Sequence, residues 1–215
     1  MEIYDTEEEQ VAAIKRWWKE NGTSTIVGVA TGIVLIVGWN FWQSHNADKA
    51  NQASALYGEL QVSASQENIE SVEKITERLS ENFQSTTYAD FAKLQLTKVK
   101  VQQNDLDAAR KLLEMLVVEA DSSEIKHIAR IRLIKLLQAA DQNEQGLQLI
   151  AEVDQSSSEG FNASYDELKG DLYVALDRLG EARTAYQSAL RSGAQSPLLQ
   201  FKLDDITAAD LVPTE

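Results

Sequence analysis

The sequence has no cysteine and only two prolines, two histidines and ten glycines. Without cysteine there can be no disulfide framework, no thiolate zinc site and no thiol nucleophile. Few prolines and glycines leave little material for hairpin turns, whereas alanine, leucine, glutamine, glutamate and lysine, which favour helices, are abundant. The part of the chain that folds in water is therefore predicted to be all-α.

Basic residues are also in the minority, with 20 lysines and arginines against 34 aspartates and glutamates and a formal net charge of −14. Most of such a surface repels a phosphate backbone, so nucleic-acid binding is not expected.

Once a short N-terminal tail and one apolar segment are set aside, about 170 residues remain, which is the size of one domain with a hydrophobic core.

The apolar segment has the features of a transmembrane helix. Residues 21–47 carry no charged side chain, and residues 26–38 are almost wholly apolar. Aromatic residues flank this core on both sides: Trp17, Trp18, Trp39, Phe41 and Trp42. The distance from Trp18 to Trp39 is about 31 Å of helix, close to the hydrocarbon thickness, and aromatic residues are enriched at both membrane surfaces. We predict a transmembrane helix over residues 23–42.

A cleavable signal peptide and a buried core helix are the two alternatives for this segment. A cleavable signal peptide has an apolar region of about 7–15 residues that is followed at once by small residues. Here Trp39, Phe41 and Trp42 occupy that place, and Ala53-Ser54-Ala55 lies too far downstream. A buried core helix seldom combines so long an uncharged run with aromatic residues at both ends. A retained anchor is therefore favoured.

The flanking charges give the anchor an orientation. Lys15, Arg16 and Lys19 lie before the apolar run, and only Lys49 lies at a comparable distance after it. Since positive flanks stay in the cytoplasm, residues 1–22 are predicted to be a cytoplasmic tail and the rest of the chain to lie outside.

Gly28 and Gly32 form a GxxxG pair, the spacing at which missing side chains let a second transmembrane helix approach closely. They are the candidate residues for helix contact within the membrane. Glycine is common in membrane helices, so the alternative that these two positions are merely tolerated stays open.

Turn-like breaks recur at regular intervals in the outer part of the chain. They are Gln66-Glu67-Asn68, Asn104-Asp105, Asp141-Gln142-Asn143 and Asp177-Arg178-Leu179-Gly180. A small or branched residue opens each following helix, at Val72, Ala109, Gly146 and Ala182, with steps of 37, 37 and 36 residues. These steps are close to the 34 residues of a tetratricopeptide repeat, so stacked helical hairpins are predicted. A generic helical bundle with accidental spacing is the alternative.

The expected fold is thus one transmembrane helix followed by a tetratricopeptide-like solenoid over residues 43–208. The last hairpin fits the repeat pattern best, through Gly170, Tyr173, Ala182, Tyr186 and Ala189. Since repeat arrays need a covered end, the segment that begins at Pro197 is expected to be a capping helix, and residues 209–215 a flexible tail. Between Phe41 and Val62 only Gly58 could interrupt a helix, so the membrane helix is expected to continue into the domain.

Catalytic and metal-binding constellations are not found in the sequence. His45 and His127 lack ligand-like spacing, and we expect each to be a solvent-facing or interfacial side chain rather than a metal ligand. No phosphate loop, nucleophile elbow or HExxH motif occurs, and the acidic runs lack the spacing of a calcium loop. We therefore predict a non-enzymatic protein without a cofactor or metal.

A concave solenoid face held near a membrane is suited to an adaptor. On tetratricopeptide geometry the inner side of the first helix of each hairpin carries the partner-binding candidates, which are Phe91, Leu94, Lys98, Ile131 and Lys135. Because a shift of one or two positions would turn this face into the core, the alternative that Phe91, Leu94 and Ile131 are packed core residues stays open.

Three N-terminal blocks carry a resemblance to a known family. They are Met1-Glu2-Ile3-Tyr4, Glu7-Glu8-Glu9-Gln10-Val11 and Lys15-Arg16-Trp17-Trp18-Lys19-Glu20-Asn21-Gly22. They resemble the YfgM family, the ancillary subunit of the bacterial SecYEG translocon. The resemblance implies a Gram-negative inner-membrane protein with a periplasmic tetratricopeptide-like domain. It implies three kinds of partner: the SecYEG translocon, a membrane-anchored periplasmic chaperone of the peptidyl-prolyl isomerase type, and unfolded exported chains.

These expectations combine into a non-enzymatic inner-membrane adaptor that assists newly exported proteins. One alternative is a membrane-anchored regulator whose cytoplasmic tail docks a stress-response signalling protein. A purely structural tether is another. An outer domain on an unrelated anchor would keep most partner contacts if the protein is an adaptor, and would lose them with the tail if it is a regulator.

Overall fold

The computed structural model describes residues 7–154, 157–193 and 196–209, and every regular element among them is a helix. The chain divides into two compact units, residues 1–52 and 53–215. The first helix, α1 (Glu7–Ser65), contributes residues to both units, as the lack of a helix breaker after residue 41 predicts. Residues 210–215, nearly all of the predicted C-terminal tail, lie outside the described residues.

Within residues 1–52, α1 contains the one segment of the described chain that is long and apolar enough to cross a membrane. None of its most apolar window is buried inside the protein. A core helix of a soluble domain would be mostly buried, so that alternative does not hold for this segment.

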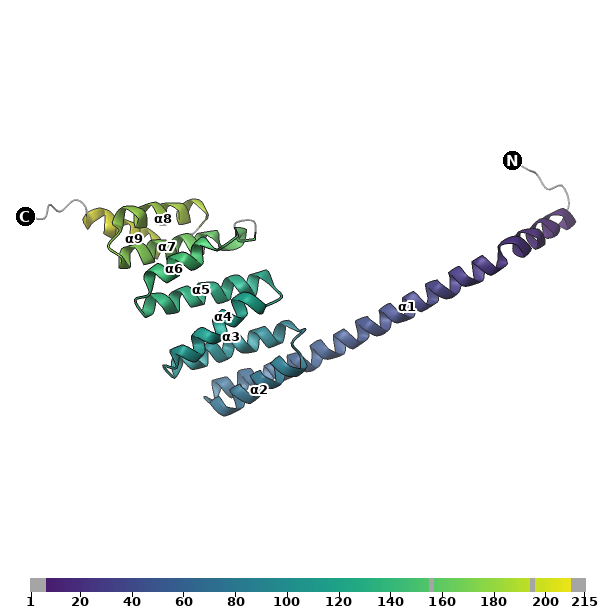
Figure 1. The fold of residues 1–215 in the computed structure, drawn as a ribbon, viewed down its shortest axis with the longest axis horizontal. Helices are drawn as coiled ribbons and strands as arrows, with labels where there is room; N and C mark the ends of the chain where they lie inside the picture. The colour runs from purple at the N-terminus through teal and green to yellow at the C-terminus, as the bar shows by residue number, and fades with distance from the viewer. Residues whose placement is uncertain (1–6, 155–156, 194–195, 210–215) are drawn as a thin grey trace, which may run out of the picture. The chain divides into compact units, whose positions relative to one another are not determined.

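Residues 53–209 form a solenoid of helical hairpins, as predicted (Figure 1). The helices are α2 (Ile69–Asn82), α3 (Thr87–Gln102), α4 (Leu106–Glu119), α5 (Ser123–Ala139), α6 (Asn143–Ala151), α7 (Asn162–Ala175), α8 (Leu179–Arg191) and α9 (Pro197–Ala209), with a short 3₁₀ helix, η1 (Glu159–Phe161). The last turns of α1 pair with α2, and α3 with α4, α5 with α6 and α7 with α8. Each helix from α2 to α9 packs on the next in chain order, which is the arrangement of a repeat array.

The four predicted breaks are the four places where a hairpin turns. Each contains one residue with positive φ: Glu67 (56°), Asn104 (60°), Asp141 (57°) and Asp177 (57°). At the second break the Asn104 N–H donates to the Val101 carbonyl (3.0 Å) and the Asp105 N–H to the Lys100 carbonyl (2.9 Å), a Schellman motif that satisfies the last carbonyls of α3. The Asp105 carboxylate then accepts from the Ala108 N–H and starts α4.

The repeat register follows from these breaks. Five residues after each positive-φ residue stands a buried side chain or glycine of the second helix: Val72, Ala109, Gly146 and Ala182. At Gly146 a Cβ would come within 3.0 Å of a Leu172 methyl group, so the backbones there are close. Small residues at this position therefore set how near neighbouring helices lie.

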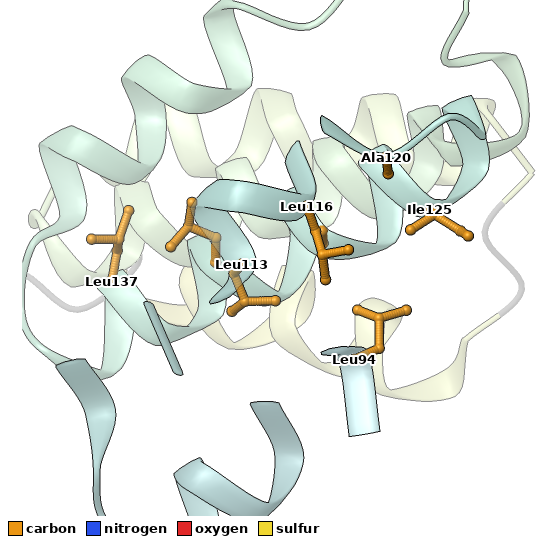
Figure 2. Packing of buried hydrophobic residues seen from close by; sticks show 8 residues of the cluster. Leu94, Leu113, Leu116, Ala120, Ile125 and Leu137 are labelled. Carbon is orange, nitrogen blue, oxygen red and sulfur yellow. The ribbon is translucent and has the colours of Figure 1, made fainter. Parts of the chain in front are cut away.

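The core is divided among neighbouring hairpins rather than collected in one centre. One cluster joins α3, α4 and α5 through Leu94, Leu113, Leu116, Ala120, Ile125, Ala129, Leu133 and Leu137, most of which Figure 2 labels. At the end of the array Leu199 and Ile206 of α9 are buried against Ala182, Tyr186 and Ala189 of α8. The segment that begins at Pro197 is therefore the capping helix that the sequence predicts.

Candidate partner-binding surface

Four of the five predicted binding residues are exposed or half-buried. Phe91 and Lys98 lie on α3 and are exposed, Lys135 on α5 is exposed, and Ile131 on α5 is half-buried. Leu94 differs from them because only 7% of it is exposed, and it belongs to the cluster shared by α3, α4 and α5 (Figure 2). Leu94 therefore supports the predicted binding surface from beneath, while the other four contribute atoms to it.

The hairpin register explains why these positions share a face. Phe91 precedes the positive-φ residue of its hairpin by thirteen positions, and so does Ile128; Lys98 and Lys135 each precede theirs by six. Equivalent positions of successive hairpins point in equivalent directions in a repeat array. We call the surface the first-helix face. It carries an apolar row, Tyr57, Phe91, Ile128 and Ile131, and a basic row, Lys98 and Lys135.

An aromatic cluster forms one end of the apolar row. The ring of Tyr57, from the last turns of α1, lies 5.8 Å from that of Tyr88 and 6.0 Å from that of Phe91, centre to centre. Tyr88 and Phe91 meet edge to face at 6.4 Å. Tyr57 and Tyr88 are half-buried and Phe91 is 36% exposed, so the cluster offers aromatic surface to a partner.

The sequence prediction missed Tyr57 and Tyr88. Tyr57 precedes Glu67 by ten positions, as Ile131 precedes Asp141 and Leu94 precedes Asn104. Because Leu94 is buried, this repeat position alone does not distinguish an exposed side chain from a core one. Tyr88 reaches the cluster only because the first turn of α3 lies beside α1.

The two lysines of the basic row differ from Lys93 and Lys100 of α3, which are held in ion pairs. Lys93 pairs with Asp90 (3.5 Å), and Lys100 pairs with Glu73. Among the described residues, neither Lys98 nor Lys135 has an acidic partner within ion-pair distance. The exposed Arg132 lies between the rows and donates to the Leu94 carbonyl at 3.4 Å. The middle of the first-helix face is therefore positively charged and open.

The fourth hairpin carries the opposite charge. Asp171 stands at the position equivalent to Lys98 and Lys135, Glu167 lies one turn before it, and the single positive charge of Lys202 balances one of these two negative charges. The Lys202 ammonium of α9 donates to Asp171 (2.7 Å) and Glu167 (2.9 Å), and the Tyr186 hydroxyl donates to Asp171 at 2.8 Å. Burial lowers the pKa of Lys202, but its hydrogen bonds with Asp171 and Glu167 and their negative charges outweigh burial and raise it. These carboxylates hold the capping helix in place and are not free for a partner.

A second hollow lies beside this surface. It has a volume of about 1070 Å³ and is lined by α6, α7 and α8, including Gln148, Tyr165, Lys169 and Tyr173. It exists because α6 has only nine residues, whereas the other second helices have 13 or 14. Its lining is mostly polar, and the sequence prediction assigned none of its residues to a binding site.

His127 is buried, with 3% exposure, and is not one of the solvent-facing side chains that the sequence suggested. Its Nδ1 lies at hydrogen-bond distance, 2.8 Å, from the Tyr165 hydroxyl, and its ring stacks on Phe161. The pair ties α5 to α7. Among the described residues, no group of three or more His, Asp or Glu side chains is placed to hold a metal ion.

In the membrane segment, Gly28 and Gly32 present an open face. A Cβ added at either position would meet no atom within 4 Å. Space for a second helix is therefore present, and contact at this pair stays a prediction.

Comparison with known proteins gives the fold and the relatives. The model of a family described as "Tetratricopeptide repeat-like domain" matches residues 15–208. A protein named "Ancillary SecYEG translocon subunit" from Escherichia coli K12 is 29% identical over 96% of this chain and all of its own length. One of the same name from Haemophilus influenzae is 31% identical over 94% of this chain and 99% of its own. The solved "MamA RS-1 ArsTM double mutant" shares the fold, with a TM-score of 0.53, 16% identity and coverage of 74% of this chain and 85% of that one.

Proposed function

The chain belongs to the YfgM family of ancillary SecYEG translocon subunits, and from this premise we propose that it is a non-enzymatic adaptor of the bacterial inner membrane. It associates with the Sec translocon and with a membrane-anchored periplasmic folding factor of the peptidyl-prolyl isomerase type, and it assists newly exported chains. The observation that carries the proposal is similarity to the named relatives over nearly the full length of both chains.

The organisation of the chain supports this role. The anchor over residues 23–42 keeps the protein in the bilayer in which the translocon lies, with residues 1–22 in the cytoplasm and the solenoid in the periplasm. Gly28 and Gly32 offer a smooth surface for a neighbouring transmembrane helix. The solenoid supplies a long surface for a folding factor or an exported chain.

The first-helix face is the proposed binding surface of the solenoid. Phe91 supplies exposed aromatic area, Ile131 extends it, and Leu94 holds α3 in place below. Lys98 and Lys135 add positive charge that favours acidic segments and makes binding sensitive to salt.

The test is isolation of the full-length protein from gently solubilised membranes after crosslinking, followed by identification of the partners. We expect both the translocon and a periplasmic folding factor to be recovered. Recovery of neither, under conditions that preserve their other complexes, would exclude the adaptor function.

A matched pair of variants tests the surface in the same experiment. Phe91→Ala should remain folded and lose crosslinks to the periplasmic partner, whereas Met115→Ala, which removes an equally exposed apolar side chain from α4, should keep them. Leu94→Ala should instead destabilise the domain by about 2–5 kcal/mol, because Leu94 is a core residue. Equal crosslinking of the Phe91 and Met115 variants would place the binding surface elsewhere.

A further inference from the structure

The first-helix face has a charge opposite to that of the whole molecule. The net charge is −14. Helix α5, however, presents two exposed basic residues, Arg132 and Lys135, and its single acidic residue, Glu124, lies in its first turn. Helix α3 carries three lysines and one aspartate, and that aspartate, Asp90, is paired with Lys93. A ligand that approaches this face therefore meets a local field unlike the average field of the protein.

The two rows on the face lie parallel and close together. Lys98 follows Phe91 by seven residues on α3, and Lys135 follows Ile131 by four and Ile128 by seven on α5. At 1.5 Å per residue these separations are about 6–10 Å. A single polypeptide segment is wide enough to contact an apolar row and a basic row at this spacing, because its side chains extend to both sides.

An extended segment fits the apolar row and the basic row when two kinds of residue alternate along it. Successive side chains of an extended chain point to opposite sides, with a rise of about 3.3 Å per residue. A segment that crosses α1, α3 and α5 between the rows therefore directs one set of side chains to Tyr57, Phe91 and Ile131 and the other set to Lys98 and Lys135. The first set must be apolar or aromatic, and the second must be acidic.

We propose that the first-helix face binds extended polypeptide segments in which apolar or aromatic residues alternate with acidic ones. This inference rests on the proposed adaptor function and names the class of segment that the adaptor takes. The fourth hairpin sets one end of the site, because Asp171 stands at the position of Lys98 and Lys135, Glu167 lies one turn before it, and Lys202 balances one of the two negative charges. An acidic segment that passed beyond α5 would meet carboxylates of its own sign, so it is confined to the first three hairpins.

The test compares three labelled peptides by fluorescence anisotropy with the full-length protein in nanodiscs of zwitterionic lipid. One peptide alternates Tyr and Glu, one Tyr and Lys, and one Ser and Glu. The Tyr and Glu peptide should bind at least about tenfold more tightly than either of the others, a difference of about 1.4 kcal/mol. The net charge of the protein alone predicts tighter binding of the Tyr and Lys peptide than of the Tyr and Glu peptide, so the sign of the preference is decisive. The affinity of the Tyr and Glu peptide should fall as salt increases.

Three charge reversals locate the site. Lys98→Glu and Lys135→Glu should each weaken binding of the Tyr and Glu peptide several-fold, whereas Lys111→Glu, the same change on an exposed position of α4, should leave it unchanged. Melting curves by circular dichroism show whether each variant is folded. A preference for the Tyr and Lys peptide, or equal effects of the three reversals, would overturn the proposal.

Failure of this proposal is distinct from failure of the adaptor function. If the translocon and a folding factor are recovered with the full-length protein but the peptides show no preference, the adaptor function stands and the segment class is wrong. If the preference is found but neither partner is recovered, the site exists in a protein with a different function.

Discussion

At the residue scale, the contact between α7 and α8 depends on a missing side chain. Gly170 of α7 faces the ring of Tyr186 on α8, and a Cβ at Gly170 would lie 2.3 Å from the ring carbons Cδ1 and Cε1. Tyr186 cannot move away easily, since it is fully packed and its hydroxyl donates to Asp171, which also holds Lys202. Gly170 thus allows the close packing of α7 on α8, and through Tyr186 and Asp171 it supports the contact with Lys202 of the capping helix.

We therefore expect Gly170→Ala to lower the stability of the full-length chain by about 1–3 kcal/mol, because the added methyl group overpacks this contact. Gly180→Ala is the matched control: Gly180 is also helical, and a Cβ there would meet no atom within 4 Å. It should leave stability unchanged or raise it by up to about 1 kcal/mol, since alanine favours helix. Thermal unfolding in detergent, followed by circular dichroism, measures both. Similar midpoints for the two variants would contradict the close contact.

At the element scale, the hairpin turns could be predicted from sequence because their signal is local. Asparagine and aspartate favour turns and tolerate positive φ, and three of the four positive-φ residues are of these types. The residues of the first-helix face were harder to predict. Successive residues of a helix differ by about 100° in direction, so Leu94 lies in the core while Phe91 and Lys98 on the same helix are exposed. Leu94 is buried because α4 and α5 pack against it. The spacing of apolar residues within α3 does not show where these two helices lie.

The positive φ gives a prediction for the turns. Asp141 has a φ of 57° at the end of α5, where glycine has no steric penalty. Asp141→Gly should raise the stability by a few tenths to about 1 kcal/mol, whereas Ala139→Gly, at the last residue of α5, should lower it by up to about 1 kcal/mol. Chemical unfolding of the two variants and the wild type measures the difference. A loss of stability in Asp141→Gly would argue against this turn geometry.

The repeat register gives a second prediction at this scale. Ala182 on α8 is fully buried at the small position of the fourth hairpin, and Gln187 on the same helix is exposed. Ala182→Leu should cost about 1–3 kcal/mol by overpacking, and Gln187→Leu less than about 0.5 kcal/mol. The readout is the midpoint of thermal unfolding, and equal midpoints would show that the register is displaced.

At the scale of the whole molecule, the apolar window of α1 and the solenoid differ in how their apolar side chains are covered. The side chains of the apolar window are not buried by protein atoms, and the window is long and apolar enough to cross a membrane. The solenoid buries its own apolar residues in clusters shared by adjacent hairpins. Composition and run length predict this difference. The aromatic cluster at Tyr57, Tyr88 and Phe91 could not be predicted in full, because it joins residues that are far apart in sequence.

The orientation of the chain in the membrane follows from the charges on either side of the apolar run. Lys15, Arg16 and Lys19 precede it and only Lys49 follows nearby, so we expect the N-terminus in the cytoplasm and the solenoid in the periplasm. Protease added to spheroplasts should digest the solenoid and leave a membrane-protected N-terminal fragment, and a C-terminal epitope should be lost together with those of known periplasmic proteins. In lysed cells the protease should also shorten the N-terminal fragment, because residues 1–22 become accessible. A C-terminal epitope that survives while periplasmic controls are digested would reverse the orientation, and the first-helix face would then meet cytoplasmic rather than exported chains.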